Sequence, residues 1–155
     1  MRKIDELLEK YGESHQNEIN KRIHWICVPA IMFSLVGMLM CVPFPNYSIL
    51  FNLATLVLMF SLGYYLRLSI PLSIGLIFII LTLLLGNFYL KQFVEEKELG
   101  YIWISIVIFI IAWIGQFYGH KVEGKKPSFL EDLQFLLIGP AWLLHFIYVK
   151  LGLNY

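Results

Sequence analysis

Five long apolar runs constrain the fold of this chain more than any other feature of its sequence. Each run reaches or approaches the ~20 residues that a helix needs to cross the hydrocarbon core of a bilayer. Backbone N–H and C=O groups cannot stay unpaired in that core, so runs of this kind predict spanning helices. The runs are Trp25–Val42, Ser48–Leu66, Ile70–Leu90, Tyr101–Tyr118 and Leu133–Val149.

The composition also indicates a membrane protein. The chain has 155 residues, of which 59% are hydrophobic and only 15% charged, too little polar surface for a soluble domain of this size. We therefore expect an all-α fold, a polytopic membrane helical bundle that forms a single domain over residues 1–155. The net charge of +1 gives no basis for nucleic-acid binding by bulk electrostatics.

The two ends of the chain are less regular than its middle. Ile4, Leu7 and Leu8 recur at helical spacing among charged residues, which predicts a short amphipathic helix on the membrane surface. The fifth run contains Pro140 and His145, which predicts a helix that is kinked, tilted or only partly inserted. If that helix spans straight, His145 lies nearer to the membrane face opposite the other histidines.

The distribution of Lys and Arg predicts the orientation. If the N-terminus is cytoplasmic and all five runs span, nine of these residues lie inside and three outside. The three outside are Lys91, Lys97 and Lys150. We therefore expect a cytoplasmic N-terminus. The segment with His15 and His24 then falls on the same membrane face as the loop that follows the fourth run and carries the third histidine.

Spacing indicates how these polar residues can meet. His15 and His24 are nine apart, which on one unbroken helix puts them about 180° apart, so a shared site requires a break in "HQNEIN". Asn20 shares a helix face with His24, and Glu123 with His120. Neutral imidazoles are the commonest ligands of first-row metals, so the three histidines predict a metal site. Ordinary interfacial polar residues remain the alternative, because the chain has no HxxxH or HxxH pair.

Three segments resemble the signatures of a known family. The first is "YGESHQNEINKRIHWICVP", with a Tyr, a His, an Asn, and a second His at the membrane entry. The second is "WIGQFYGHKVEGKKPSFLEDL", a Trp-x-x-Gln-Phe-x-Gly-His stretch followed by Glu and Pro, and the third is "GPAWLL". Together they resemble the 2-hydroxy fatty acid dioxygenase family known from yeast phytosphingosine breakdown, and the resemblance covers nearly the whole chain.

The resemblance implies an iron(II)-dependent membrane enzyme that shortens 2-hydroxy fatty acids by one carbon with O₂ and releases CO₂. It implies Fe(II) ligands at His15, His24 and His120. The other signature positions are matched by Tyr11, Asn20, Gln116 and Glu123. Glu123 or Asn20 is expected as a fourth ligand or as an orienting residue, and Gln116 and Tyr11 are expected to position the hydroxy acid.

One position departs from the family: many members carry a Glu near the place of His145, which leaves the ligand set open. The site is expected on the cytoplasmic face, of the bacterial inner membrane in a prokaryote or of the endoplasmic reticulum in a eukaryote. Acyl chain length, oligomeric state and pathway stay open.

The absence of other cofactor motifs fits a metal. The sequence has no glycine loop typical of flavin or nicotinamide binding and no CxxCH for haem, while O₂ chemistry requires a redox metal or an organic cofactor. Two alternatives stay open. One is a non-catalytic protein that binds lipid or shapes the membrane. The other is a zinc-dependent lipid hydrolase with Glu123 as general base.

Overall fold

The computed structural model describes residues 2–45, 48–95, 100–124 and 129–154, and for 129–134 it describes the backbone alone. Every regular element in this part of the chain is an α-helix, as the sequence predicts. The helices are α1 (Lys3–Glu13), α2 (Glu18–Met40), α3 (Leu53–Leu68), α4 (Ile70–Glu95), α5 (Tyr101–Glu123) and α6 (Phe129–Lys150).

The helical conformation is interrupted between α1 and α2, where the sequence predicts a break. α1 ends at Glu13, and α2 begins after Asn17, whose side-chain oxygen accepts hydrogen bonds from the backbone N–H groups of Ile19 and Asn20. Such a cap satisfies N–H groups that have no partner within the helix. The short turn of residues 14–17 changes the direction of the chain, so His15 is free of the helical register of α2.

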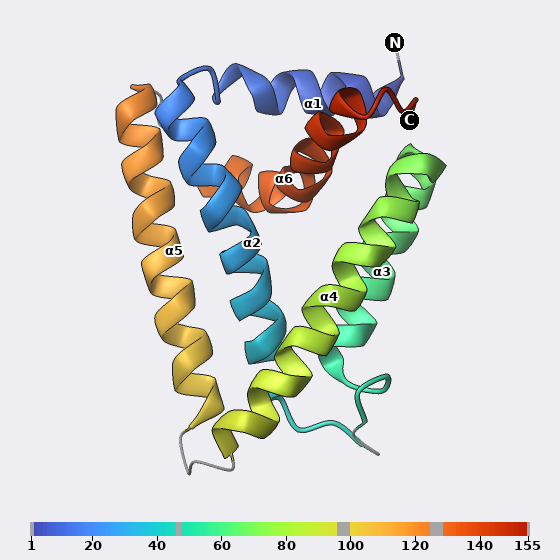
Figure 1. Cartoon of the computed structure of the whole chain (residues 1–155), viewed down its shortest axis with the longest axis vertical. Coiled ribbons are helices and arrows are strands. Elements are labelled where there is room, and N and C mark those ends of the chain that lie inside the picture. Colours follow the sequence, from blue (N-terminus) through green and yellow to red (C-terminus); the bar gives the residue numbers. More distant parts are fainter. Residues whose placement is uncertain (1, 46–47, 96–99, 125–128, 155) are drawn as a thin grey trace.

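Two helix pairs form the arms of a V (Figure 1): α2 with α5, and α3 with α4. The first pair packs very closely because Gly115 and Gly119, four residues apart on α5, face α2. A Cβ at Gly115 would lie 2.6 Å from Cys27 Sγ, and one at Gly119 would clash with Asn20 Oδ1. Small residues at this spacing let helix backbones approach in membranes. They bring the end of α5, with His120, against the start of α2.

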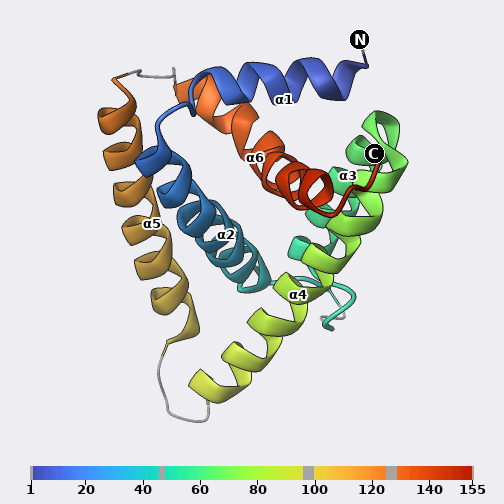
Figure 2. The same cartoon turned by 45° about the horizontal axis from the view of Figure 1, so that its top comes forward.

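α6 lies across the open end of the V, beneath α1, rather than along the arms (Figures 1 and 2). The apolar face of α1 is buried on it: Ile4 and Leu8 are 1% and 6% exposed and belong to one cluster with Ile138 and Trp142. Each such side chain contributes about 1.5–3 kcal/mol on burial. The amphipathic character predicted for the N-terminal helix is thus present, and its apolar stripe covers protein.

Within the part of the chain that the structure describes, three helices are long and apolar enough to cross a membrane: α2, α4 and α5, with mean hydropathies of 2.0, 2.3 and 1.9. α3 has 16 residues, and the apolar part of α6 is also shorter than a full span. The expectation of about five apolar spanning helices is therefore only partly confirmed. Large apolar side chains also face outward, such as Phe60 at 75% and Trp103 at 68% exposure, as in a protein that contacts lipid.

The orientation of α6 changes the expected place of His145. The side chain lines a pocket of about 220 Å³ together with Asp5, Leu8 and Glu9 of α1 and Trp142 of α6. It therefore lies at the end of the molecule where α1 is, not at the opposite end, because α6 packs against α1 instead of running straight through.

Candidate metal centre

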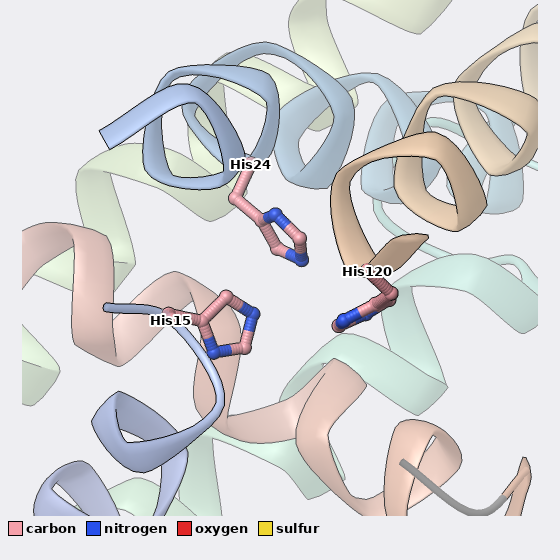
Figure 3. A group of neighbouring side chains, drawn as sticks. All are labelled: His15, His24 and His120. Atoms are coloured by element: carbon pink, nitrogen blue, oxygen red, sulfur yellow. The ribbon is translucent and has the colours of Figure 1, made fainter. Parts of the chain in front are cut away.

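Three histidines from different parts of the chain converge at the open end of the V. His15 comes from the turn between α1 and α2, His24 from the second turn of α2, and His120 from the last turn of α5. Figure 3 shows their rings pointing toward a common space, and one nitrogen of each lies within 4.8 Å of the others. Two imidazoles on one ion, each bonded at about 2.0–2.1 Å, can be up to about 4.2 Å apart. Small side-chain rotations therefore suffice to reach that spacing.

Backbone carbonyls fix the orientation of two of these rings. His15 Nδ1 donates to Tyr11 O at 2.7 Å, and His24 Nδ1 donates to Asn20 O at 2.9 Å. A carbonyl oxygen only accepts, so the proton is on Nδ1 and the lone pair is on Nε2. A hydrogen bond of this kind commonly orients a metal-bound histidine through its other nitrogen.

The first two histidines are buried, and the first of them offers an unused lone pair. His15 and His24 are each 1% exposed, and His15 Nε2 has no hydrogen-bond partner. Burial lowers the pKa of His15 to about 4, because desolvation disfavours the imidazolium more than the Tyr11 carbonyl favours it. The ring is neutral at pH 7 and able to bind a cation. A buried nitrogen without a partner costs free energy, which a bound metal would recover, so the residues fit a metal ion.

Glu123 holds the elements of the cluster together. Its carboxylate accepts hydrogen bonds from Gln16 N and Asn17 N, each at 2.9 Å, and from Asn20 Nδ2 at 3.0 Å. It thus ties the end of α5 to the turn that carries the first histidine, and its negative charge lies at the N-terminus of α2, where the helix dipole favours it. Asn20 continues the connection, since its own carbonyl orients His24.

These contacts bear on the two roles expected for Glu123 and Asn20. Among the His, Cys, Asp and Glu side chains of the described residues, the group that can jointly hold a metal consists of the three histidines alone. Both carboxylate oxygens of Glu123 are engaged with backbone or amide N–H groups. For Glu123 the geometry therefore favours orientation of the histidines over direct metal binding, whereas Asn20 Oδ1 is buried without a hydrogen-bond partner.

A small cavity of about 20 Å³ adjoins the histidines, with room for about one water. Besides the histidines, it is lined by the polar Tyr11, Trp113 and Gln116 and by the apolar Val28, Phe135 and Leu136. Gln116 Oε1 and Trp113 Nε1 are buried and have no hydrogen-bond partner. The cavity thus presents one unused acceptor and one unused donor beside the candidate ligands.

The site contains both residues that were expected to position a substrate. Gln116 lines the cavity, and the Tyr11 ring stacks on His15 at 4.2 Å between centroids. Sequence reasoning did not place Trp113 or Trp142 at the site. Trp113 is three residues before Gln116 and seven before His120, so helical spacing alone puts all three on one face of α5. Trp142, whose ring centroid is 5.3 Å from that of His15, left no such signal because it depends on the path of α6.

Comparisons with known proteins identify the family of the chain. The family model described as 2-hydroxy-palmitic acid dioxygenase Mpo1-like matches residues 1–151. The 2-hydroxy-palmitic acid dioxygenase MPO1 of Saccharomyces cerevisiae is 35% identical over 147 residues, which are 92% of this chain and 78% of the yeast protein. No solved structure matches the chain. The resemblance seen in the sequence is thereby confirmed, and the chain belongs to the 2-hydroxy-palmitic acid dioxygenase Mpo1-like family.

Proposed function

We propose that this chain is an iron(II)-dependent membrane dioxygenase that shortens 2-hydroxy fatty acids by one carbon, with iron held by His15, His24 and His120. The observation that carries the proposal is the convergence of three imidazoles, including a buried His15 Nε2 that has no partner. The name of the yeast relative supports the substrate class. Iron(II), when bound, would supply the one-electron chemistry that triplet O₂ needs to react with a closed-shell acid.

The proposed reaction balances without a further reductant. A 2-hydroxy acid and O₂ give the acid one carbon shorter, CO₂ and water. The bond between C1 and C2 breaks, C1 leaves as CO₂, and C2 becomes the new carboxyl carbon, while O₂ accepts all four electrons. The enzyme therefore needs its substrate and O₂ but no electron-donating partner protein.

The remaining residues of the cavity bind and enclose the head of the substrate. Gln116 Oε1 is available to accept a hydrogen bond from the 2-hydroxyl, and Trp113 Nε1 to donate one to the carboxylate. Tyr11, stacked on His15, keeps that ring in place. Val28, Phe135 and Leu136 exclude water on the apolar side, which strengthens each of these polar contacts.

The two alternative functions find less support. A zinc-dependent hydrolase needs a general base beside the metal. Glu123, the candidate for that role, already accepts three hydrogen bonds. A protein that only binds lipid or shapes the membrane gives no reason for a buried imidazole nitrogen without a partner next to two other histidines.

The test is metal content together with product analysis on protein purified in detergent without oxygen. We expect about one iron per chain, which is lost in a variant with His15, His24 and His120 all changed to Ala. With 2-hydroxypalmitic acid and O₂, the expected products are pentadecanoic acid and CO₂. His145→Ala is the matched control, because it removes a histidine outside the cluster, and it should retain iron. Wild-type turnover in His120→Ala, or turnover independent of O₂, would contradict the proposal.

A further inference from the structure

Figure 2 shows that α6 approaches α2 and α4 between the arms of the V. Residues of these three helices line a larger hollow. It is a groove of about 310 Å³, within the range of about 300–1,000 Å³ typical of small-molecule sites. α2 contributes Val28 and Met32, α4 contributes Phe78 and Thr82, and α6 contributes Pro140 and Leu143. The groove opens at the outer surface of the helices, since Phe78, one of its lining residues, is 67% exposed.

The groove is suited to hydrocarbon. Thr82 is its one polar lining side chain among the described residues, and the Thr82 hydroxyl already donates to Phe78 O at 2.8 Å. No lining group is therefore left to bind a polar head, and burial of apolar surface is the only driving force that the groove offers. Its occupant is an alkyl chain whose head binds elsewhere.

The groove adjoins the cavity beside the histidines. Val28 lines both spaces. On α2, His24, Val28 and Met32 follow one another at four-residue intervals, about 6 Å apart along one helix face. On α6, Leu136 lines the cavity and Pro140, one turn later, lines the groove. Along both helices, one turn leads from the polar cavity into the apolar groove.

We propose that the acyl tail of the substrate lies in this groove between α2, α4 and α6, while its 2-hydroxy acid head lies at the three histidines. This inference rests on the proposed function. A free fatty acid is the occupant rather than a bilayer phospholipid, because the proposed reaction acts on a free 2-hydroxy acid and no lining group of the groove is left to bind a phosphate. The lateral opening lets the tail enter from the bilayer without passing through water.

Gly139 of α6 packs closely at the boundary between the two spaces. A Cβ at this position would lie 3.2 Å from both Tyr11 Oη and Val28 Cγ1. α6 therefore passes within contact distance of Val28, which lies between the cavity and the groove. It also contacts Tyr11, whose ring stacks on His15. In the proposed arrangement, the tail passes beside Val28, which lines both the cavity and the groove.

The experiment is photocrosslinking with a 2-hydroxypalmitic acid that carries a diazirine at mid-chain, on iron-loaded protein kept without O₂ so that nothing is turned over. We expect labels on the α2 peptide around Met32 and the α4 peptide around Phe78 and Thr82. Excess 2-hydroxypalmitic acid should suppress them, and excess phosphatidylcholine should not. Labels spread over the lipid-facing sides of α3 and α5, or competed by the phospholipid, would overturn the proposal.

A matched pair of variants tests the groove by filling it. Thr82→Trp puts a large ring into the groove, whereas Leu81→Trp puts it at the neighbouring position, which is 47% exposed and lines no part of the groove. We expect labelling to fall about tenfold in Thr82→Trp, equivalent to about 1.4 kcal/mol, and to stay within about twofold in Leu81→Trp. Equal labelling in both variants would overturn the proposal.

The same samples separate the failure of this inference from that of the proposed function. If labelling follows the groove but no shortened acid forms with O₂, the acyl site stands and the proposed reaction fails. If pentadecanoic acid forms but the labels lie outside the groove, the reaction stands and the acyl site fails. Where turnover is measurable, Thr82→Trp should also reduce use of 2-hydroxypalmitic acid relative to 2-hydroxyoctanoic acid.

Discussion

Glu123 is the residue whose role is most sharply testable, because its carboxylate accepts three hydrogen bonds from the start of α2 and the turn before it. Glu123→Gln keeps the shape but places an NH₂ group opposite N–H donors. If Glu123 orients the histidines, Glu123→Gln should weaken iron affinity about 10–100-fold without abolishing binding. His120→Ala, which removes a ligand, should abolish iron binding. Iron titration against a competing chelator distinguishes the two.

The control for this prediction is Glu18→Gln. Glu18 also lies near the start of α2, but its side chain is 75% exposed and pairs only with Lys21 among the described ion pairs. Iron affinity should therefore stay within about twofold of wild type. If Glu123→Gln loses iron as completely as His120→Ala, Glu123 is a ligand and the orienting role is wrong.

At the same scale, sequence reasoning singled out residues that the structure brings together, but it did not show which contacts they make. The three histidines were identifiable because few polar residues border the apolar runs. The spacing of His120 and Glu123 places both on one helix face and is equally compatible with two ligands. Only the position of Asn17, which starts α2 beside Glu123, shows that the carboxylate binds backbone N–H groups. That contact joins residues 106 apart in sequence, beyond any local pattern.

At the scale of elements, the seam between α2 and α5 determines whether the site forms. Gly119→Ala would drive a methyl group into Asn20 Oδ1 and separate the helices that carry His24 and His120. We expect a loss of about 1–3 kcal/mol in unfolding free energy, and a parallel loss of iron. Unfolding in mixed micelles, followed by circular dichroism, measures the first effect.

Gly63→Ala on α3 is the matched control, because nothing lies within 4 Å of a Cβ at that position. Since alanine is the better helix former, this variant should unfold at the same free energy or up to about 1 kcal/mol higher. If the two glycine variants behave alike, close packing at the α2–α5 seam is not what positions His120.

The sequence predicted that the helices exist better than it predicted how they run, for a physical reason. A run of apolar residues predicts a buried or lipid-exposed helix, and α2, α4 and α5 follow that pattern. Hydropathy does not encode direction, so it could not show that α6 lies across the V. The path of α6 depends on contacts with α1, such as those of Ile4 and Leu8 with Ile138 and Trp142. These side chains are apolar whichever partner they contact.

At the scale of the whole molecule, the transverse α6 changes the topology. Both termini lie at the end where the histidines are (Figure 1), whereas five spanning helices would put them on opposite sides. Lys150, at the end of α6, thereby moves to the same side as Arg2 and Lys3. The bias of Lys and Arg toward that side becomes stronger than the sequence alone indicated, which favours a cytoplasmic location for the site and both termini.

Single cysteines in a chain with Cys27 and Cys41 replaced by Ser test this topology in sealed bacterial spheroplasts. Arg2→Cys and Asn154→Cys should react with a membrane-impermeant maleimide only after permeabilisation, because both ends are expected in the cytoplasm. Glu95→Cys, at the far end of α4, should react in intact spheroplasts. If Asn154→Cys also reacts there while Arg2→Cys does not, α6 spans the membrane. In that case the groove beneath it could not have the form seen here, since its α6 wall depends on the transverse course.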